Sequence, residues 1–372
     1  MSNQGNESWP TWLPIRSALA DLKPYGAPQI TDVTALNTNE NPYQLPDAVV
    51  SEMLAALPKI LQNLNRYPDR DATALRSALA SYINGTTTNK FMVSNIWAAN
   101  GSNEILQTLM LACGGRGALG FIPSYSVHPL IAKATGTSWI SNDRDENFEL
   151  NVDKAIQVIS DKKPGITFIT TPNNPTGTAT AYKDLEKLAI AASQIEGLLI
   201  VDEAYAEFSS EISAVTLIAQ YPNVIVIRTM SKAFAFAGAR LGYLIADPAV
   251  IDSLQLVRLP YHLSAITQAV AEVALSFSDE LLAGVDTLIA QREIVQAGLT
   301  KLGLTITPSA ANFLLFGGFN QPADQLWRKL LDRGILIRDV GLLGQLRVTI
   351  GTAAENQAFL SALTEVLAEG DK

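Results

Sequence analysis

Short apolar runs alternate with longer helical stretches through the middle of the chain, and this alternation constrains the fold more than any other feature. Five runs have the length and apolar character of buried strands: 118–122, 166–171, 197–201, 224–229 and 241–246. Helical spacing predicts helices between some of these strands, for example over 182–195. Alternating strands and helices build a mostly parallel central sheet that helices cover on both faces. We therefore predict an α/β fold.

The pattern changes towards both ends of the 372-residue chain, a length that suggests two domains. Helical spacing predicts five further helices: 47–58, 72–83, 264–277, 281–302 and 353–369. A few short strand-like runs lie between the last two helices, which indicates a second, smaller α+β unit. We expect an N-terminal arm that joins the small domain, then a large domain and the small domain itself: 1–43, 44–260 and 261–372.

Composition argues against several classes of protein. The chain has 27 basic and 36 acidic residues and a formal net charge of −9, whereas a nucleic-acid binder needs a basic face. The single cysteine, Cys113, cannot form an internal disulfide, and two histidines with one cysteine are too few for a zinc site. No uncharged apolar run reaches the ~18 residues of a membrane span, and the polar, Pro-rich start lacks the apolar core of a signal peptide. We expect a cytoplasmic protein without a metal, a membrane or a nucleic acid as partner.

One glycine motif points away from nucleotide binding. Gly115, Gly117 and Gly120 fit the G-x-G-x-x-G pattern. That fingerprint follows a strand and opens a helix, whereas here it follows a helical stretch and leads into the apolar run 118–122. We interpret these residues as turn glycines before a strand.

Three polar segments come directly after predicted strands. They are PNNPTG (172–177), DEAY (202–205) and MSKAF (230–234). Asn174, Asp202 and Lys232 are separated by 28 and 30 residues, and each interval suits one strand–helix–strand unit. Because parallel strands end at the same edge of the sheet, an amide, a carboxylate and a lysine should converge there, where open α/β sheets bind ligands.

This trio suits pyridoxal phosphate. That cofactor needs a lysine amine for its Schiff base, a carboxylate that keeps the pyridine nitrogen protonated, and donors to the phenolic oxygen. Residues 99–104 (ANGSNE) precede a helical stretch, whose free N–H groups would receive the phosphate. Arg240 and the hydroxyls of Thr229 and Ser231 would add charge and hydrogen bonds, and Tyr125 offers a flat face for ring stacking.

Each of these residues also has an ordinary structural explanation. An Asp after a strand is often a turn or helix cap, a Ser-Lys pair is usually on the surface, and PNNPTG is a plausible Pro/Asn/Gly loop. Their combination at one sheet edge favours the cofactor site over these separate explanations.

Beyond the trio, several segments resemble a known family. PNNPTG, DEAY and SKAFAFAGARLGY are similar to fold-type I pyridoxal-phosphate aminotransferases. A longer set resembles histidinol-phosphate aminotransferases, especially the actinobacterial form: LKPYGAPQ (22–29), LNTNENPY (36–43), NRYPDRDATALR (65–76), VDEAYAEF (201–208), RLPYHLS (258–264) and LRVTIGT (346–352). The resemblance runs from about residue 13 to 369. It implies a large domain with a mostly parallel sheet and a smaller α+β domain.

The resemblance also implies a role for each matching residue. Lys232 would form the Schiff base and move the proton between two carbons, Asp202 would pair with the ring nitrogen, and Tyr205 with Asn174 would bond the phenolic oxygen. Tyr125 would stack on the ring. The phosphate would be held by Gly101, Ser102, Asn103, Thr229, Ser231 and Arg240, with Tyr67 reaching it across a homodimer interface. The substrate pocket would be lined by Tyr25, Asn39, Tyr125, Asn174, Tyr261, Arg338 and Arg347.

The implied reaction transfers an amino group between L-histidinol phosphate and 2-oxoglutarate, giving imidazole-acetol phosphate and L-glutamate in histidine biosynthesis. One rival is an aminotransferase for aromatic amino acids such as phenylalanine, with the same cofactor set. A phospho-amino-acid decarboxylase of the same fold is a second. A non-catalytic ligand-binding or regulatory module is a third, although it would normally bring a basic DNA-binding extension. Met230, where relatives often have Leu, is a volume-conserving change.

Overall fold

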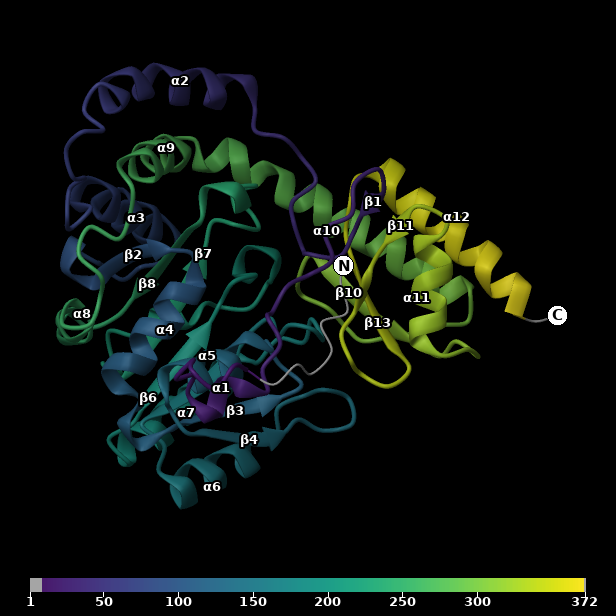
Figure 1. The fold of residues 1–372 in the computed structure, drawn as a ribbon, viewed down its shortest axis with the longest axis horizontal. Helices are drawn as coiled ribbons and strands as arrows, with labels where there is room; N and C mark the ends of the chain where they lie inside the picture. The colour runs from purple at the N-terminus through teal and green to yellow at the C-terminus, as the bar shows by residue number, and fades with distance from the viewer. Residues whose placement is uncertain (1–8, 371–372) are drawn as a thin grey trace.

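The computed structural model describes residues 9–370, and Figure 1 shows a large sheet with helices on both faces beside a smaller α+β unit. The large sheet has seven strands, in the order β2 (Ile96–Asn100), β8 (Leu241–Ile245), β7 (Val224–Thr229), β6 (Leu198–Asp202), β5 (Ile166–Thr170), β3 (Ala118–Ile122) and β4 (Trp139–Asp143). β8 runs antiparallel to both of its neighbours, β2 and β7, and all other neighbouring pairs in the sheet are parallel. The prediction of a mostly parallel sheet is confirmed.

Two of these strands were not predicted from the sequence. β2 contains two alanines, which have weak strand preference, and β4 has the polar sequence WISND because it lies at the edge of the sheet. The five predicted strands are all present, with bounds that differ by one residue at most. Their long apolar runs are easier to recognise because both faces are buried.

Helices cover the two faces of the large sheet. Successive strand side chains point to opposite faces, so Ile200 belongs to one core cluster and Val201 to the other. One face packs against α4 (Ser102–Cys113), α5 (Val127–Thr135) and α8 (Pro248–Gln255). The opposite face packs against α3 (Thr73–Thr86), α6 (Val152–Lys162) and α7 (Tyr182–Gln194).

The C-terminal part forms a second, antiparallel sheet. Its strands lie in the order β12 (Arg338–Asp339), β13 (Gln345–Thr349), β10 (Phe313–Gly317) and β9 (Thr305–Ile306). Three helices belong to this part: α10 (Ser278–Lys301), α11 (Ala323–Leu331) and α12 (Ala353–Gly370). Figure 1 shows α10 running from the large sheet to this smaller unit.

The N-terminal segment crosses from one unit to the other. After α1 (Ser17–Ala20), β1 (Thr34–Ala35) pairs in parallel with β11 (Ile335–Leu336), about 300 residues later in the chain. The chain then returns to α2 (Asp47–Leu61), which packs against α9 (Ala265–Ser276). The division at 43 and 260 stays a prediction, and α9 lies beyond its second boundary while packing on helices of the large unit.

The glycine motif has the predicted structure. Gly115 lies in a short 3-10 turn, and Gly117, with a φ of +83°, ends that turn immediately before β3. A positive φ is readily available to glycine, so this residue allows the chain to enter the strand. Within residues 9–370, no helix combines the length and apolarity of a membrane span.

Candidate active site

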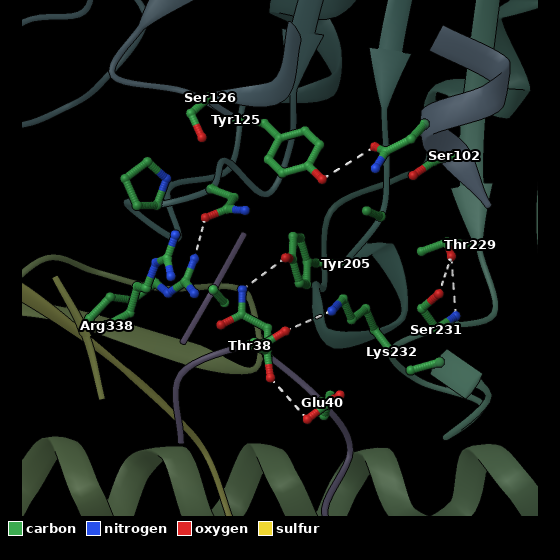
Figure 2. A pocket seen from close by; sticks show the side chains of 18 of the residues that line it. Thr38, Glu40, Ser102, Tyr125, Ser126, Tyr205, Thr229, Ser231, Lys232 and Arg338 are labelled. Atoms are coloured by element: carbon green, nitrogen blue, oxygen red, sulfur yellow. Dashed lines mark hydrogen bonds between the residues drawn. The ribbon is translucent and has the colours of Figure 1, made fainter. Parts of the chain in front are cut away.

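A cavity of about 460 Å³ lies where the large sheet, the N-terminal segment and the C-terminal sheet meet. Figure 2 shows side chains from all three converging on it. Its lining includes most of the predicted site residues: Tyr25, Asn39, Ser102, Asn103, Tyr125, Asn174, Asp202, Tyr205, Thr229, Ser231, Lys232, Arg240, Arg338 and Arg347. The lining has four basic and three acidic side chains, so the cavity is locally basic in an acidic chain.

The residues at the centre of the cavity lie at or just beyond the ends of three neighbouring parallel strands. Asp202 ends β6 and Thr229 ends β7, while Asn174 lies four residues beyond β5. Lys232 follows β7 by three residues. Since β5, β6 and β7 are parallel neighbours, these residues meet at one edge of the sheet.

Lys232 extends into the cavity, where its Nζ donates a hydrogen bond to the carbonyl of Thr38 at 2.9 Å (Figure 2). Burial, together with the nearby guanidinium of Arg347, lowers the pKa of Lys232 to about 8. A larger fraction of this amine is therefore neutral near physiological pH than for an ordinary lysine. A neutral amine is the nucleophilic form.

Asp202 is buried and held from two sides. Its Oδ1 accepts a hydrogen bond from the backbone N–H of Ala204 at 3.3 Å, and its Oδ2 lies 3.3 Å from Nε2 of His128. His128 is itself buried and stacks on Phe168. Sequence reasoning missed His128, because a single histidine does not indicate which face of its helix meets Asp202.

Tyr205 and Asn174 each have one polar atom engaged by a neighbour. The hydroxyl of Tyr205 accepts a hydrogen bond from Nδ2 of Asn39 at 2.8 Å. Oδ1 of Asn174 accepts one from Nη1 of Arg347. The Tyr205 hydroxyl hydrogen and the Asn174 Nδ2 group therefore remain available as donors.

The amino end of α4 forms a close-packed polar cradle. Gly101 precedes the helix with a φ of +78°, and an added Cβ would meet Nη2 of Arg240 at 2.7 Å. An added Cβ on Gly242, in β8, would collide with the backbone N of Ser102. Both glycines thus allow a guanidinium and a helix N-terminus to approach one point, an arrangement that suits an anion.

Further polar groups surround this cradle. The hydroxyl of Thr229 donates to that of Ser231 at 2.9 Å. Tyr125 donates its hydroxyl hydrogen to Oδ1 of Asn103 at 3.2 Å, which fixes its ring above the cavity (Figure 2). Burial raises the pKa of Tyr125, so its hydroxyl stays protonated.

Two arginines approach from the C-terminal sheet. Arg338 in β12 lies directly opposite Arg347 in β13. Arg347 is buried and donates to the carbonyl of Asn37 at 2.8 Å, with its guanidinium carbon 5.1 Å from the ring centre of Phe313. Its Nε has no partner, and burial lowers its pKa to about 10. The two segments that carry these arginines are therefore paired strands of one antiparallel sheet.

Three predicted site residues do not line the cavity. Gly101 lies just behind it, at the start of α4. Tyr67 and Tyr261 stack on each other with ring centres 4.3 Å apart, and both are exposed, at 79% and 41%. Their roles in cofactor and substrate binding stay predictions, because they involve a second subunit or a bound substrate.

The N-terminal segment contributes more than the sequence indicated. Asn37, Thr38 and Glu40 also line the cavity, whereas the sequence predicted only Tyr25 and Asn39 from this segment. The carbonyls of Asn37 and Thr38 accept hydrogen bonds from Arg347 and Lys232. Backbone acceptors leave no residue-type signal, so sequence reasoning could not have found them. Within the part of the chain that the structure describes, no group of three His, Cys, Asp or Glu could hold a metal ion.

Comparison with known proteins places this chain in a family. The family model described as aminotransferase class I and II matches residues 31–363. The chain is 53% identical over 357 residues to the histidinol-phosphate aminotransferase of Mycolicibacterium smegmatis, covering 95% of this chain and 93% of that one. It is also 53% identical over 351 residues to that of Nocardia farcinica, covering 94% and 90%.

A solved structure agrees with these relatives. The crystal structure of the histidinol-phosphate aminotransferase from Clostridium acetobutylicum is 25% identical, with a TM-score of 0.80 over 90% of this chain and 99% of that chain. An aspartate aminotransferase mutant from Thermus thermophilus, at 21% identity and a TM-score of 0.80, shares the fold. The predicted fold class, fold type I, is therefore confirmed. The chain belongs to the class I and II aminotransferase family and, within it, to the histidinol-phosphate aminotransferases.

Proposed function

We propose that the protein transfers the amino group of L-histidinol phosphate to 2-oxoglutarate with pyridoxal phosphate as cofactor, giving imidazole-acetol phosphate and L-glutamate in histidine biosynthesis. The proposal rests on one observation above the others: a nucleophilic lysine, a buried carboxylate and a helix N-terminus meet in one cavity. The relatives at 53% identity supply the substrate class.

The residues present fit this cofactor. Gly101 and Gly242 leave room at the amino end of α4, which a Cβ on either residue would fill. The phosphate would lie there, held by the backbone N–H groups of Ser102 and Asn103, by Arg240, and by the hydroxyls of Thr229 and Ser231. This donor set has the positive charge that a phosphate dianion requires.

The remaining contacts follow from the hydrogen-bond inventory. Asp202 would hold the proton on the pyridine nitrogen, with His128 keeping the carboxylate in place. The free donors of Tyr205 and Asn174 would both bind the phenolic oxygen, because their other polar atoms are engaged by Asn39 and Arg347. Tyr125 would stack against the ring.

Lys232 performs the proton transfers in this proposal. Pyridoxal phosphate supplies a carbonyl that captures amines and a ring that withdraws electrons from Cα of the substrate. The Lys232 amine would act as the general base that takes the proton from Cα of the substrate, and then as the acid that delivers it to the cofactor's C4′ carbon. Asp202 assists by keeping the ring nitrogen protonated.

Arg347 and Arg338 would bind the anionic ends of both substrates in turn. A guanidinium offers parallel donors that suit phosphate and carboxylate alike, so one residue can serve both half-reactions. The unpartnered Nε of Arg347 is consistent with an additional acceptor from a substrate.

Steady-state rates with four amino donors test this proposal: histidinol phosphate, histidinol, phenylalanine and tyrosine. We expect histidinol phosphate to have the highest kcat/KM, because a lost charge-assisted hydrogen bond costs roughly ten- to a hundredfold in affinity. Equal use of histidinol phosphate and histidinol would contradict phosphate recognition. A preference for phenylalanine would favour the aromatic aminotransferase instead.

We also propose a cytoplasmic homodimer with composite active sites. The Tyr67–Tyr261 stack is exposed, and the chain segments that precede each tyrosine carry further exposed aliphatic side chains that a second copy would cover: Leu54, Leu61, Leu64, Leu256 and Leu259. Light scattering should give twice the chain mass. Mixing Lys232→Ala with Tyr67→Phe chains should restore activity, because one of the two sites in each heterodimer is then intact. A fully active monomer would contradict the proposal.

A further inference from the structure

A buried ion-pair network lies directly behind the cofactor edge of the sheet. Arg228 donates from Nε at 3.0 Å and from Nη2 at 2.9 Å to Oε2 of Glu203, and from Nη1 at 3.3 Å to Oε1 of Glu207. Ser213 joins the network, since its Oγ accepts from Arg228 and donates to Glu203 at 2.7 Å. All three charged side chains are at most 8% exposed.

The network and the candidate active site occupy opposite faces of the same two strands. Asp202 and Thr229 line the cavity of about 460 Å³, whereas their chain neighbours Glu203 and Arg228 line a second cavity of about 550 Å³. This follows from the alternation of side chains along a strand. Asp202 is thus followed in the chain by Glu203 of the network, and Thr229 is preceded by Arg228.

The Glu203–Arg228 ion pair lies at the point where β6 and β7 stop pairing. The last paired residues of β6 and β7 are Asp202 and Ile227, and the backbone N–H of Glu203 donates to Ile227 at 2.9 Å. Beyond this point the pairing of β6 with β7 stops, and the chain continues from the two strands as separate segments, 203–208 and 229–232. The Glu203–Arg228 pair is therefore a side-chain link between the strands at the point where their backbone pairing ends.

Those two diverging segments hold different parts of the proposed site. One begins at Asp202 and includes Tyr205, and Glu207 ties its 3-10 turn (Ala206–Phe208) to the same arginine. The other contains Thr229, Ser231 and Lys232. A cofactor that contacts both segments binds well only if their separation is fixed in advance, since reorganisation on binding weakens affinity.

We propose that Arg228 is a positioning residue: through Glu203 and Glu207 it fixes the spacing between the segment that carries Asp202 and Tyr205 and the segment that carries Thr229 and Lys232. This inference rests on the proposed cofactor. A buried ion pair is by itself weak evidence for stability, and fixing a geometry is a function that an apolar replacement would not reproduce.

Arg228→Lys in the full chain tests the inference, since lysine retains the charge but not the fork of donors. Titration of the apoprotein with pyridoxal phosphate should give a dissociation constant about tenfold above that of the native chain. The pH midpoint of the bound cofactor's absorbance change should also shift, because it depends on how Asp202 and Tyr205 face the ring. Arg116→Lys is the matched control. Arg116 donates to the carbonyls of Ile195 and Glu196 near the start of β6, away from the cofactor edge. The dissociation constant of this variant for pyridoxal phosphate should therefore equal that of the native chain.

The outcomes separate this inference from the proposed function. A native chain that takes up no pyridoxal phosphate would contradict the proposed function itself. A native chain that binds it, with an Arg228→Lys variant of equal affinity and unchanged pH midpoint but lower thermal stability, would show that the network is only structural and overturn the inference. If Arg228→Lys does not fold, Ser213→Ala removes the network's hydroxyl, which also accepts from the backbone N–H of Val215, and should raise the dissociation constant for pyridoxal phosphate about two- to threefold. An unchanged constant in Ser213→Ala would then overturn the inference.

Discussion

The two sides of the candidate active site are built in different ways. The side that we assign to the cofactor comes from the ends of β5, β6 and β7, three adjacent strands of one buried sheet. The side that we assign to the substrate comes from residues 37–40 and from β12 and β13, which are some 300 residues apart in the chain. The first side is one continuous sheet, whereas on the second side hydrogen bonds of individual side chains join residues 37–40 to the paired strands β12 and β13.

Asn39 illustrates how the substrate side is held together. Its backbone N–H donates to Thr349 at 3.0 Å, its Nδ2 donates to Tyr205, and its carbonyl accepts from Asn312 at 3.1 Å. One residue thus joins the N-terminal segment to the C-terminal sheet and to the cofactor side. The comparison teaches that damage to the cofactor side should abolish chemistry, whereas damage to the substrate side should change affinity and specificity.

Loss of Lys232 should have the largest effect. Lys232→Ala should fold and bind the cofactor only non-covalently. Its rate of transamination should fall by at least about a thousandfold, because both the nucleophile and the general base are lost. Borohydride reduction and peptide mapping of the native protein should label Lys232, and Lys187→Ala, at an exposed lysine paired with Asp184, should retain full activity. Labelling of another lysine would disprove the assignment.

Arg347→Lys should affect binding of both substrates. We expect KM for histidinol phosphate and for glutamate to rise together by about ten- to a hundredfold, while the cofactor absorbance stays unchanged, because lysine lacks the paired donors. Steady-state kinetics with each substrate measures this. Arg328→Lys, on the exposed face of α11, is the control. An increase for one substrate alone would mean that the two anions are bound by different residues.

Asn39→Ala should have an intermediate effect, because Asn39 connects the substrate side of the site to the cofactor side. It removes the bond to the Tyr205 hydroxyl and leaves a non-Asn residue at a φ of +55°, so we expect a loss of about 1–2 kcal/mol in the free energy of unfolding. KM should rise severalfold. Asn37→Ala is the control, because it removes a bond to Pro28 but keeps the backbone carbonyl that accepts from Arg347. Equal effects of both variants would show that the link to Tyr205 is unimportant.

The smallest effect concerns the titration of Lys232. Because burial lowers its pKa to about 8, the amine in the apoprotein loses its proton about two and a half pH units below an ordinary lysine. Labelling of Lys232 by an acylating reagent should therefore rise through a midpoint near pH 8. The unfolded chain keeps this proton up to about pH 10.5, so the group's contribution to stability should increase between pH 8 and 10.5. A labelling midpoint near 10.5 would show that burial does not act on this amine.

The cofactor side was predictable because sequence spacing and strand topology are directly linked. Asn174, Asp202 and Lys232 follow apolar runs at intervals of one strand–helix–strand unit, and parallel strands bring such residues together whatever the details of packing. His128 and the Arg228 network were not predicted. Their roles depend on which face of a helix or strand meets Asp202, and a single histidine or arginine in an apolar stretch gives no such information.

The sequence by itself determined the α/β fold, the sheet edge and the residues that end its strands, because buried parallel strands are long, apolar and regularly spaced. Only the tertiary structure decided that residues 37–40 lie against β13 and that the carbonyls of Asn37 and Thr38 receive Arg347 and Lys232. Those contacts join segments far apart in the chain and use backbone atoms, which every residue type provides. Their positions therefore follow from the packing of the whole molecule and from no local pattern of residues.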